Sequence, residues 1–122
     1  MAYLSLLMVD DTPVLLNIQK GLIARLGHQV TTATSGKEAI ELAQRSTFDA
    51  ILMDMQMPEM NGTQASIRMR ELGIVTPIIA LTGNDSLSDR IRCQEAGMNG
   101  FLTKPLQTSA LQQELMKLGL SR

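Results

Sequence analysis

Strand-like and helix-like segments alternate along the whole chain, and this alternation is the strongest constraint on its fold. Short unbroken apolar runs suit strands covered on both faces, and one polar, β-branched segment suits a sheet edge. Strands are expected at 6–9, 29–34 (the polar one), 50–53, 78–81 and 99–103, and helices at 13–26, 35–45, 63–72, 86–97 and 108–118. Five β–α units in succession predict an α/β fold with a single parallel sheet and helices on both faces. For five strands we expect the flavodoxin-like order 2-1-3-4-5.

Local signals add detail to the helices. Capping boxes open two of them, at Ser35–Glu38 and Ser86–Asp89. The first helix has apolar residues within about 80° of arc, and we expect this face to pack on the sheet. Its residues are Leu15, Ile18, Leu22 and Leu26. His28 follows a helix-ending glycine and is expected in a surface loop, and Arg90 and Arg92 are expected on a solvated helix face.

Length and composition exclude several classes of protein. The 122 residues fit one domain, with its core at about residues 4–118. Eleven Lys and Arg against 12 Asp and Glu give a net charge of -1, which argues against a nucleic-acid-binding face. No apolar run approaches the ~18 residues of a membrane span, and residues 1–9 do not resemble a signal peptide. The single cysteine, Cys93, fits a reducing compartment, so we expect a cytoplasmic protein.

Chemically useful side chains stand where four of the strands end. The first strand is followed by Asp10 and Asp11, the third by Asp54, the fourth by Thr82 and the fifth by Lys104. Ligands of such sheets bind beyond the carboxyl ends of the strands, where the order reverses, so these side chains are expected to converge. Taken singly, either of the first two aspartates would be interpreted as a helix cap. The joint pattern favours a site.

The expected cluster calls for a cation. Three carboxylates held together repel one another unless a cation is present. A hard divalent ion that takes oxygen ligands, Mg²⁺ or Mn²⁺, removes this repulsion. A carboxylate beside such an ion, a lysine and a hydroxyl can attack a phosphoryl group, because the cations neutralise charge on its oxygens. The pattern therefore indicates phosphoryl transfer to an aspartate.

From Leu6 to about Leu118 the chain resembles the receiver domain of two-component response regulators. Four motifs carry the resemblance, each at a strand end. They are Val9-Asp10-Asp11, Met53-Asp54-Met55-Gln56-Met57-Pro58-Glu59-Met60-Asn61-Gly62, Leu81-Thr82-Gly83 and Lys104-Pro105. The resemblance implies a signalling domain that catalyses only its own phosphorylation and dephosphorylation. The Met-rich run and Ala96-Gly97-Met98 are similar to receivers attached to hybrid histidine kinases.

The resemblance implies a role for each residue of the cluster. Asp54 would accept the phosphoryl group, and Lys104 would pair with the phosphoryl oxygens. Asp11, Asp54 and the backbone carbonyl of Gln56 would bind Mg²⁺ directly, whereas Asp10 would hold it mostly through water. In the family the peptide bond before Pro105 is cis.

Other residues would tune the response. Thr82 would be the switch hydroxyl, and Phe101 stands at the family's rotating aromatic position, although it could equally be a core residue. Gln56 and Asn84 flank the approach of a hydrolytic water; both are neutral amides that can orient it, which predicts an intermediate phosphorylation lifetime. The alternative is that both amides only face solvent.

The resemblance also implies a partner, which is a histidine kinase or a histidine phosphotransfer domain. Val14, Leu16 and Pro105 border the site where the family docks a histidine-bearing helical bundle, and partial burial under loops is the alternative for the two aliphatic side chains. A weak homodimer through the fourth helix, fifth strand and fifth helix is a second expected contact. Nucleic acid and membrane are not expected partners of this segment, although it could be the cytoplasmic part of a membrane-bound hybrid kinase.

Three rival functions share features of this pattern. A haloacid-dehalogenase-type enzyme has its nucleophilic aspartate at the end of the first strand and needs a second aspartate two residues later, where this chain has Thr12. A flavodoxin needs a phosphate-binding loop after the first strand, where two acids would repel the flavin phosphate. A pseudo-receiver that binds partners without phosphorylation is disfavoured by the complete set of site residues.

Overall fold

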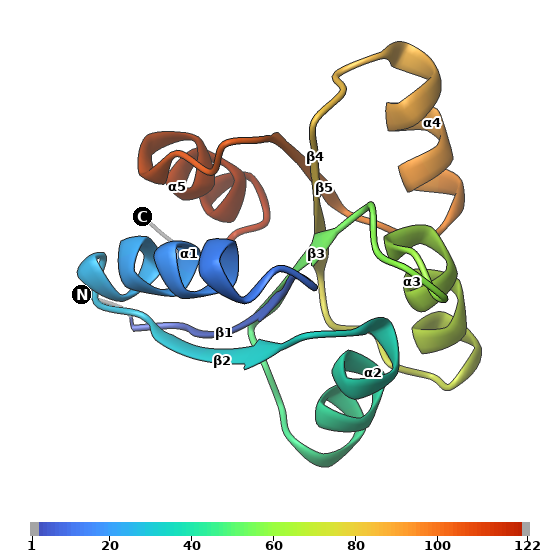
Figure 1. Cartoon of the computed structure of the whole chain (residues 1–122), viewed down its shortest axis with the longest axis horizontal. Helices are drawn as coiled ribbons and strands as arrows, with labels where there is room; N and C mark the ends of the chain where they lie inside the picture. Colours follow the sequence, from blue (N-terminus) through green and yellow to red (C-terminus); the bar gives the residue numbers. More distant parts are fainter. Residues whose placement is uncertain (1–2, 121–122) are drawn as a thin grey trace.

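The computed structural model describes residues 3–120, and in this range ten elements alternate between strand and helix. Their bounds are β1 Ser5–Val9, α1 Pro13–Arg25, β2 Gln29–Ala33, α2 Gly36–Arg45, β3 Ala50–Asp54, α3 Gly62–Glu71, β4 Ile78–Thr82, α4 Leu87–Glu95, β5 Gly100–Thr103 and α5 Thr108–Lys117. All strand pairs are parallel, in the order β2-β1-β3-β4-β5. The predicted fold class and strand order are confirmed (Figure 1).

The sheet separates two hydrophobic layers, because successive strand residues point to opposite faces. Leu7 and Val9 of β1 pack on the side of α2, α3 and α4, whereas Leu6 and Met8 pack on the side of α1 and α5. β3 and β4 alternate in the same way, and Figure 1 shows the two helical layers. Within residues 3–120, no helix is both long and apolar enough to cross a membrane.

The buried face of α1 differs from the predicted one. Leu16, Gln19 and Ile23 are buried, whereas Leu15 is 42% exposed and Ile18 55% exposed. Apolar residues cover more than one side of this helix, so their spacing alone could not select the face that packs. The buried stripe includes the polar residue Gln19, so the hydrophobic periodicity of the helix does not indicate this face.

His28 is buried, so its expected place in a surface loop is wrong. Gly27 has a φ of 93°, which turns the chain sharply after α1 and brings the imidazole under the start of β1. The Nδ1 atom of His28 accepts a hydrogen bond from the backbone N–H of Leu4 at 3.2 Å, and Nε2 lies 3.4 Å from Oε1 of Gln112. The ring thus links the start of β1 to α5.

Candidate functional site

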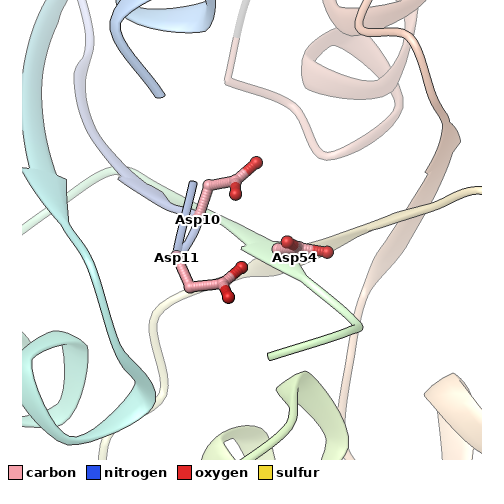
Figure 2. A group of neighbouring side chains, drawn as sticks. All are labelled: Asp10, Asp11 and Asp54. Atoms are coloured by element: carbon pink, nitrogen blue, oxygen red, sulfur yellow. The ribbon is translucent and has the colours of Figure 1, made fainter. Parts of the chain in front are cut away.

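Three carboxylates meet at the carboxyl edge of the sheet. Asp10 and Asp11 follow β1, and Asp54 is the last residue of the adjacent β3 (Figure 2). One oxygen from each carboxylate lies within 4.8 Å of the other two. Asp10 and Asp54 are buried, and Asp11 is half-buried. The convergence predicted for these three residues is therefore confirmed.

Asp54 is held by two donors that bind the same oxygen. The Nζ atom of Lys104 lies 2.9 Å from Oδ1, and the backbone N–H of Gln56 donates to Oδ1 at 3.1 Å. Burial raises the pKa of the Asp54 carboxyl above its usual value, while these two donors act in the opposite direction. Neither donor contacts the other oxygen, Oδ2, which can therefore bind a cation or act as a nucleophile.

Asp10 carries an unsatisfied oxygen. Its Oδ1 accepts the backbone N–H of Thr12 at 2.9 Å, but its Oδ2 is fully buried and has no hydrogen-bond partner among residues 3–120. A buried carboxylate oxygen without a partner is costly unless a cation or water meets it. Together with two neighbouring carboxylates, this oxygen fits an oxygen-ligated divalent ion.

Thr82 and Lys104 complete the site from the next two strands. Thr82 ends β4 and is buried, and its Oγ1 accepts the backbone N–H of Asn84 at 3.2 Å. The backbone N–H of Lys104 donates to the carbonyl of Thr82 at 2.7 Å, which ties the two loops together. The peptide bond between Lys104 and Pro105 is cis, as the resemblance implies. All five predicted side chains thus lie at this edge.

The loop between β3 and α3 approaches the site closely, and a glycine permits this. A Cβ on Gly62 would lie 2.6 Å from the carbonyl oxygen of Asp54 and 3.0 Å from the Cα of Met55. Asn61 is the N-cap of α3, and its side chain accepts the backbone N–H of Gln64 in a capping box. The spacing from Asn61 to Gln64 is the sequence signal for this cap.

The two amides expected to tune the lifetime lie beside the site. Gln56 and Asn84 are exposed, and both line a pocket of about 220 Å³ that Thr82 also lines. Cys93 lies on the wall of this pocket and is buried in α4. Burial raises the pKa of its thiol.

The predicted partner face is only partly present. Val14 is 70% exposed and Pro105 is also exposed, but Leu16 is 6% exposed and packs among the core residues under α1 and α5. The expectation that Leu16 offers a docking surface is therefore wrong, because α1 is rotated relative to the predicted face. Leu15 and Ile18 take its place beside Val14 on the exposed side.

Arg90 has a contact that its sequence position did not predict. Its side chain is exposed, yet the guanidinium carbon lies 4.5 Å from the centre of the Phe101 ring. Arg90 stands in α4 and Phe101 in β5, so only tertiary packing brings them together. Phe101 itself is half-buried against the core layer of α2, α3 and α4.

Comparison with known proteins agrees with this site. The family model described as response regulator receiver domain matches residues 6–116. Sensor histidine kinase RcsC of Salmonella typhi is 34% identical over 110 residues, which are 90% of this chain but 12% of RcsC. Two-component response regulator 24 of Arabidopsis thaliana is 42% identical over 116 residues, covering 94% of this chain and 84% of that protein.

A solved structure extends the likeness to three dimensions. It is the receiver domain of sensor histidine kinase PA1611 from Pseudomonas aeruginosa PAO1, which has a magnesium ion coordinated in its active-site cleft. It matches this chain with a TM-score of 0.82 and 40% identity, over 95% of this chain and 97% of that one. The chain therefore belongs to the response regulator receiver domains, which are phospho-accepting domains of two-component signalling.

Proposed function

We propose that residues 1–122 form one receiver domain, with its core at about 4–118, that takes a phosphoryl group onto Asp54. The donor is the phosphohistidine of a histidine kinase or of a histidine phosphotransfer domain. The observation that carries this proposal is the setting of Asp54, a buried carboxylate paired with Lys104 at 2.9 Å beside two further acids. Pairing leaves Oδ2 of Asp54 as the nucleophile.

Mg²⁺ or Mn²⁺ is the proposed cofactor, and the residues present fit it. Asp11 and Asp54 supply carboxylate oxygens, and the backbone carbonyl of Gln56 is the proposed third ligand. The unpartnered Oδ2 of Asp10 supports a water-mediated contact. When bound, the ion supplies positive charge that offsets the charge on the phosphoryl oxygens.

The chain's own residues carry out the transfer. Oδ2 of Asp54 attacks the phosphorus, and the P–N bond of the phosphohistidine breaks. The bonding electron pair stays on the imidazole nitrogen, which takes up a proton from solvent. Lys104 neutralises charge on a phosphoryl oxygen, and the hydroxyl of Thr82 donates a hydrogen bond to another. The products are an aspartyl phosphate and a neutral histidine.

The switch is proposed to begin at Thr82. To donate to a phosphoryl oxygen, its hydroxyl must give up the hydrogen bond that it now donates to the carbonyl of Asn84 at 3.4 Å. The loop between β4 and α4 moves with it, and Phe101 follows on β5.

The phosphorylated state is proposed to have an intermediate lifetime. A water attacks the phosphorus opposite Asp54, and the P–O bond to Asp54 breaks with its electron pair remaining on the carboxylate. Inorganic phosphate leaves with one proton of the water, and the other proton goes to solvent. Gln56 and Asn84 line one pocket with Thr82, which supports the proposal that they orient this water. We expect Gln56→Leu or Asn84→Leu to slow phosphate loss several-fold, since ~1.4 kcal/mol of barrier is a tenfold change in rate. If both variants lose phosphate at the parent rate with Mg²⁺ affinity unchanged, these amides do not set the lifetime.

The proposed docking face for the histidine-bearing partner includes Val14 and Pro105, which are exposed near the site. The proposed location is the cytoplasm, either as a separate regulator or as the cytoplasmic part of a membrane-bound hybrid kinase. A weak homodimer through α4, β5 and α5 stays a prediction.

Acetyl phosphate and Mg²⁺ test the proposed function without a partner. Intact mass should rise by one phosphoryl group in the parent, and the gain should disappear in Asp54→Asn. Asp49→Asn is the matched control, because Asp49 lies at the opposite end of the sheet and receives the N–H of Ser5. An undiminished mass gain in Asp54→Asn would exclude Asp54 as the acceptor.

A further inference from the structure

The ring of Phe101 is covered from outside by a side chain of α4. The guanidinium carbon of Arg90 lies 4.5 Å from the ring centre, within the range of a cation–π contact. On its inner side the half-buried ring packs against the core layer of α2, α3 and α4. The backbone of Phe101 is fixed separately, because its N–H donates to Oε1 of Glu114 in α5 at 3.0 Å.

Arg90 is itself held by the loop that carries Thr82. Its Nε donates to Oδ1 of Asp85 at 2.7 Å. Asp85 lies between β4 and α4, next to Asn84, whose N–H donates to Oγ1 of Thr82. A continuous series of contacts therefore runs from Thr82 through Asp85 and Arg90 to Phe101.

The surroundings allow this connection to change. Among its nine residues α4 buries only Cys93, so the helix is fixed by little apolar packing. A pocket of about 200 Å³ lies beside the ring, lined by residues that include Arg90, Met98 and Glu114. The ring has room to move once the side chain above it moves.

We propose that Arg90 is a positioning residue that restrains Phe101 through its ion pair with Asp85. This inference rests on the proposed function, because the event that releases the restraint is phosphorylation of Asp54. When the Thr82 hydroxyl turns from the carbonyl of Asn84 to a phosphoryl oxygen, the adjacent Asp85 shifts, and Arg90 loses the partner that keeps it over the ring. The Asp85–Arg90 pair thereby favours the unphosphorylated arrangement.

Fluorine NMR of the whole chain tests the restraint in the resting state. The sequence has only two phenylalanines, Phe48 and Phe101, so 4-fluorophenylalanine gives two resonances, and buried Phe48 serves as an internal reference. Asp85→Asn removes the ion-pair partner of Arg90 and leaves the Arg90 side chain itself unchanged. We expect it to shift or broaden the Phe101 resonance and to leave that of Phe48 unchanged. The control Arg92→Gln breaks another ion pair of the same helix, with Asp89, and should move neither.

Binding of Mg²⁺ with beryllium trifluoride, a phosphoryl mimic, tests the link to phosphorylation. Asp85→Asn and Arg90→Gln should bind it about two- to fivefold more tightly than the parent, as expected for losing one exposed ion pair and one cation–π contact. Arg92→Gln should bind it like the parent. A purely structural role of Arg90 would not tighten binding.

The outcomes separate this inference from the proposed function. An unmoved Phe101 resonance in Asp85→Asn overturns the restraint by Arg90, whatever the mimic does. Unchanged affinity in both variants overturns it as well. If the parent does not bind the mimic at all, the proposed function fails, and the resting-state spectrum still decides whether Arg90 positions Phe101.

Discussion

Replacing Asp10 with asparagine should stabilise the metal-free protein. At the 4.8 Å that bounds the separation of the carboxylate oxygens, two unit charges repel by about 3.5 kcal/mol at an effective dielectric constant of about 20. Asp10 faces two such charges, but Lys104 offsets that of Asp54, and Asp11 is half in solvent. We therefore expect a net gain of only about 1–3 kcal/mol in the free energy of unfolding.

The geometry favours asparagine at this position. The Oδ1 atom of Asp10 accepts the N–H of Thr12, and an amide oxygen can replace it. The orphaned Oδ2 would become an NH₂ group that can donate to the neighbouring carboxylates. Thermal unfolding in EDTA should show the gain as a midpoint higher by roughly 4 °C or more.

Mg²⁺ should reverse the order of the two unfolding midpoints or bring the two midpoints together. A ligand stabilises the folded state in proportion to its binding, and Asp10→Asn lacks one charge that supports the ion. Mg²⁺ should thus raise the midpoint of the parent more than that of the variant. Asp49→Asn is the control and should show no gain in EDTA. If Asp10→Asn is no more stable than the parent in EDTA, or if Mg²⁺ stabilises both proteins equally, carboxylate repulsion at Asp10 does not limit the stability of the metal-free protein.

Two further predictions follow from packing. Val14→Glu should fold normally, slow phosphoryl transfer from a phosphohistidine donor several-fold and leave the reactivity toward acetyl phosphate unchanged. Leu16→Glu should unfold the domain, which circular dichroism would show, because Leu16 is buried. If Val14→Glu slows the reactions with both donors equally, Val14 has no docking role. Arg70→Gln should lower the free energy of unfolding, measured in urea, by about 2–4 kcal/mol, because the guanidinium of Arg70 donates to three backbone carbonyls and to Asn99. The exposed control Arg68→Gln should lower it by less than about 1 kcal/mol. Equal losses in the two variants would refute the role of this hydrogen-bond network.

Local signals in the sequence were sufficient for most of the architecture. Apolar runs, caps and the β–α alternation predicted every strand and helix to within two residues at each end. The site followed from the same reasoning, because the carboxyl ends of parallel strands share one edge, and Asp10, Asp54 and Thr82 each stand at such an end. Residues that directly follow or end a strand need no long-range information to be placed.

Residues whose position depends on rotation or on distant partners could not be predicted in this way. The face of α1 was misassigned because the helix is apolar on several sides, and its contacts with the sheet decide that Leu16 rather than Leu15 is buried. His28 is buried only because the start of β1 and α5 surround it.

The sequence by itself determined the alternation of strands and helices, the acidic cluster at the strand ends and the membership in the receiver family, since all three depend on the order of local segments. Tertiary structure alone decided which side chains of α1 face solvent and that Arg90 covers Phe101 across two elements. The physical reason is that a periodic pattern specifies which segments form helices and strands, whereas the rotation of a helix and the contacts between elements are set by close packing of the assembled core.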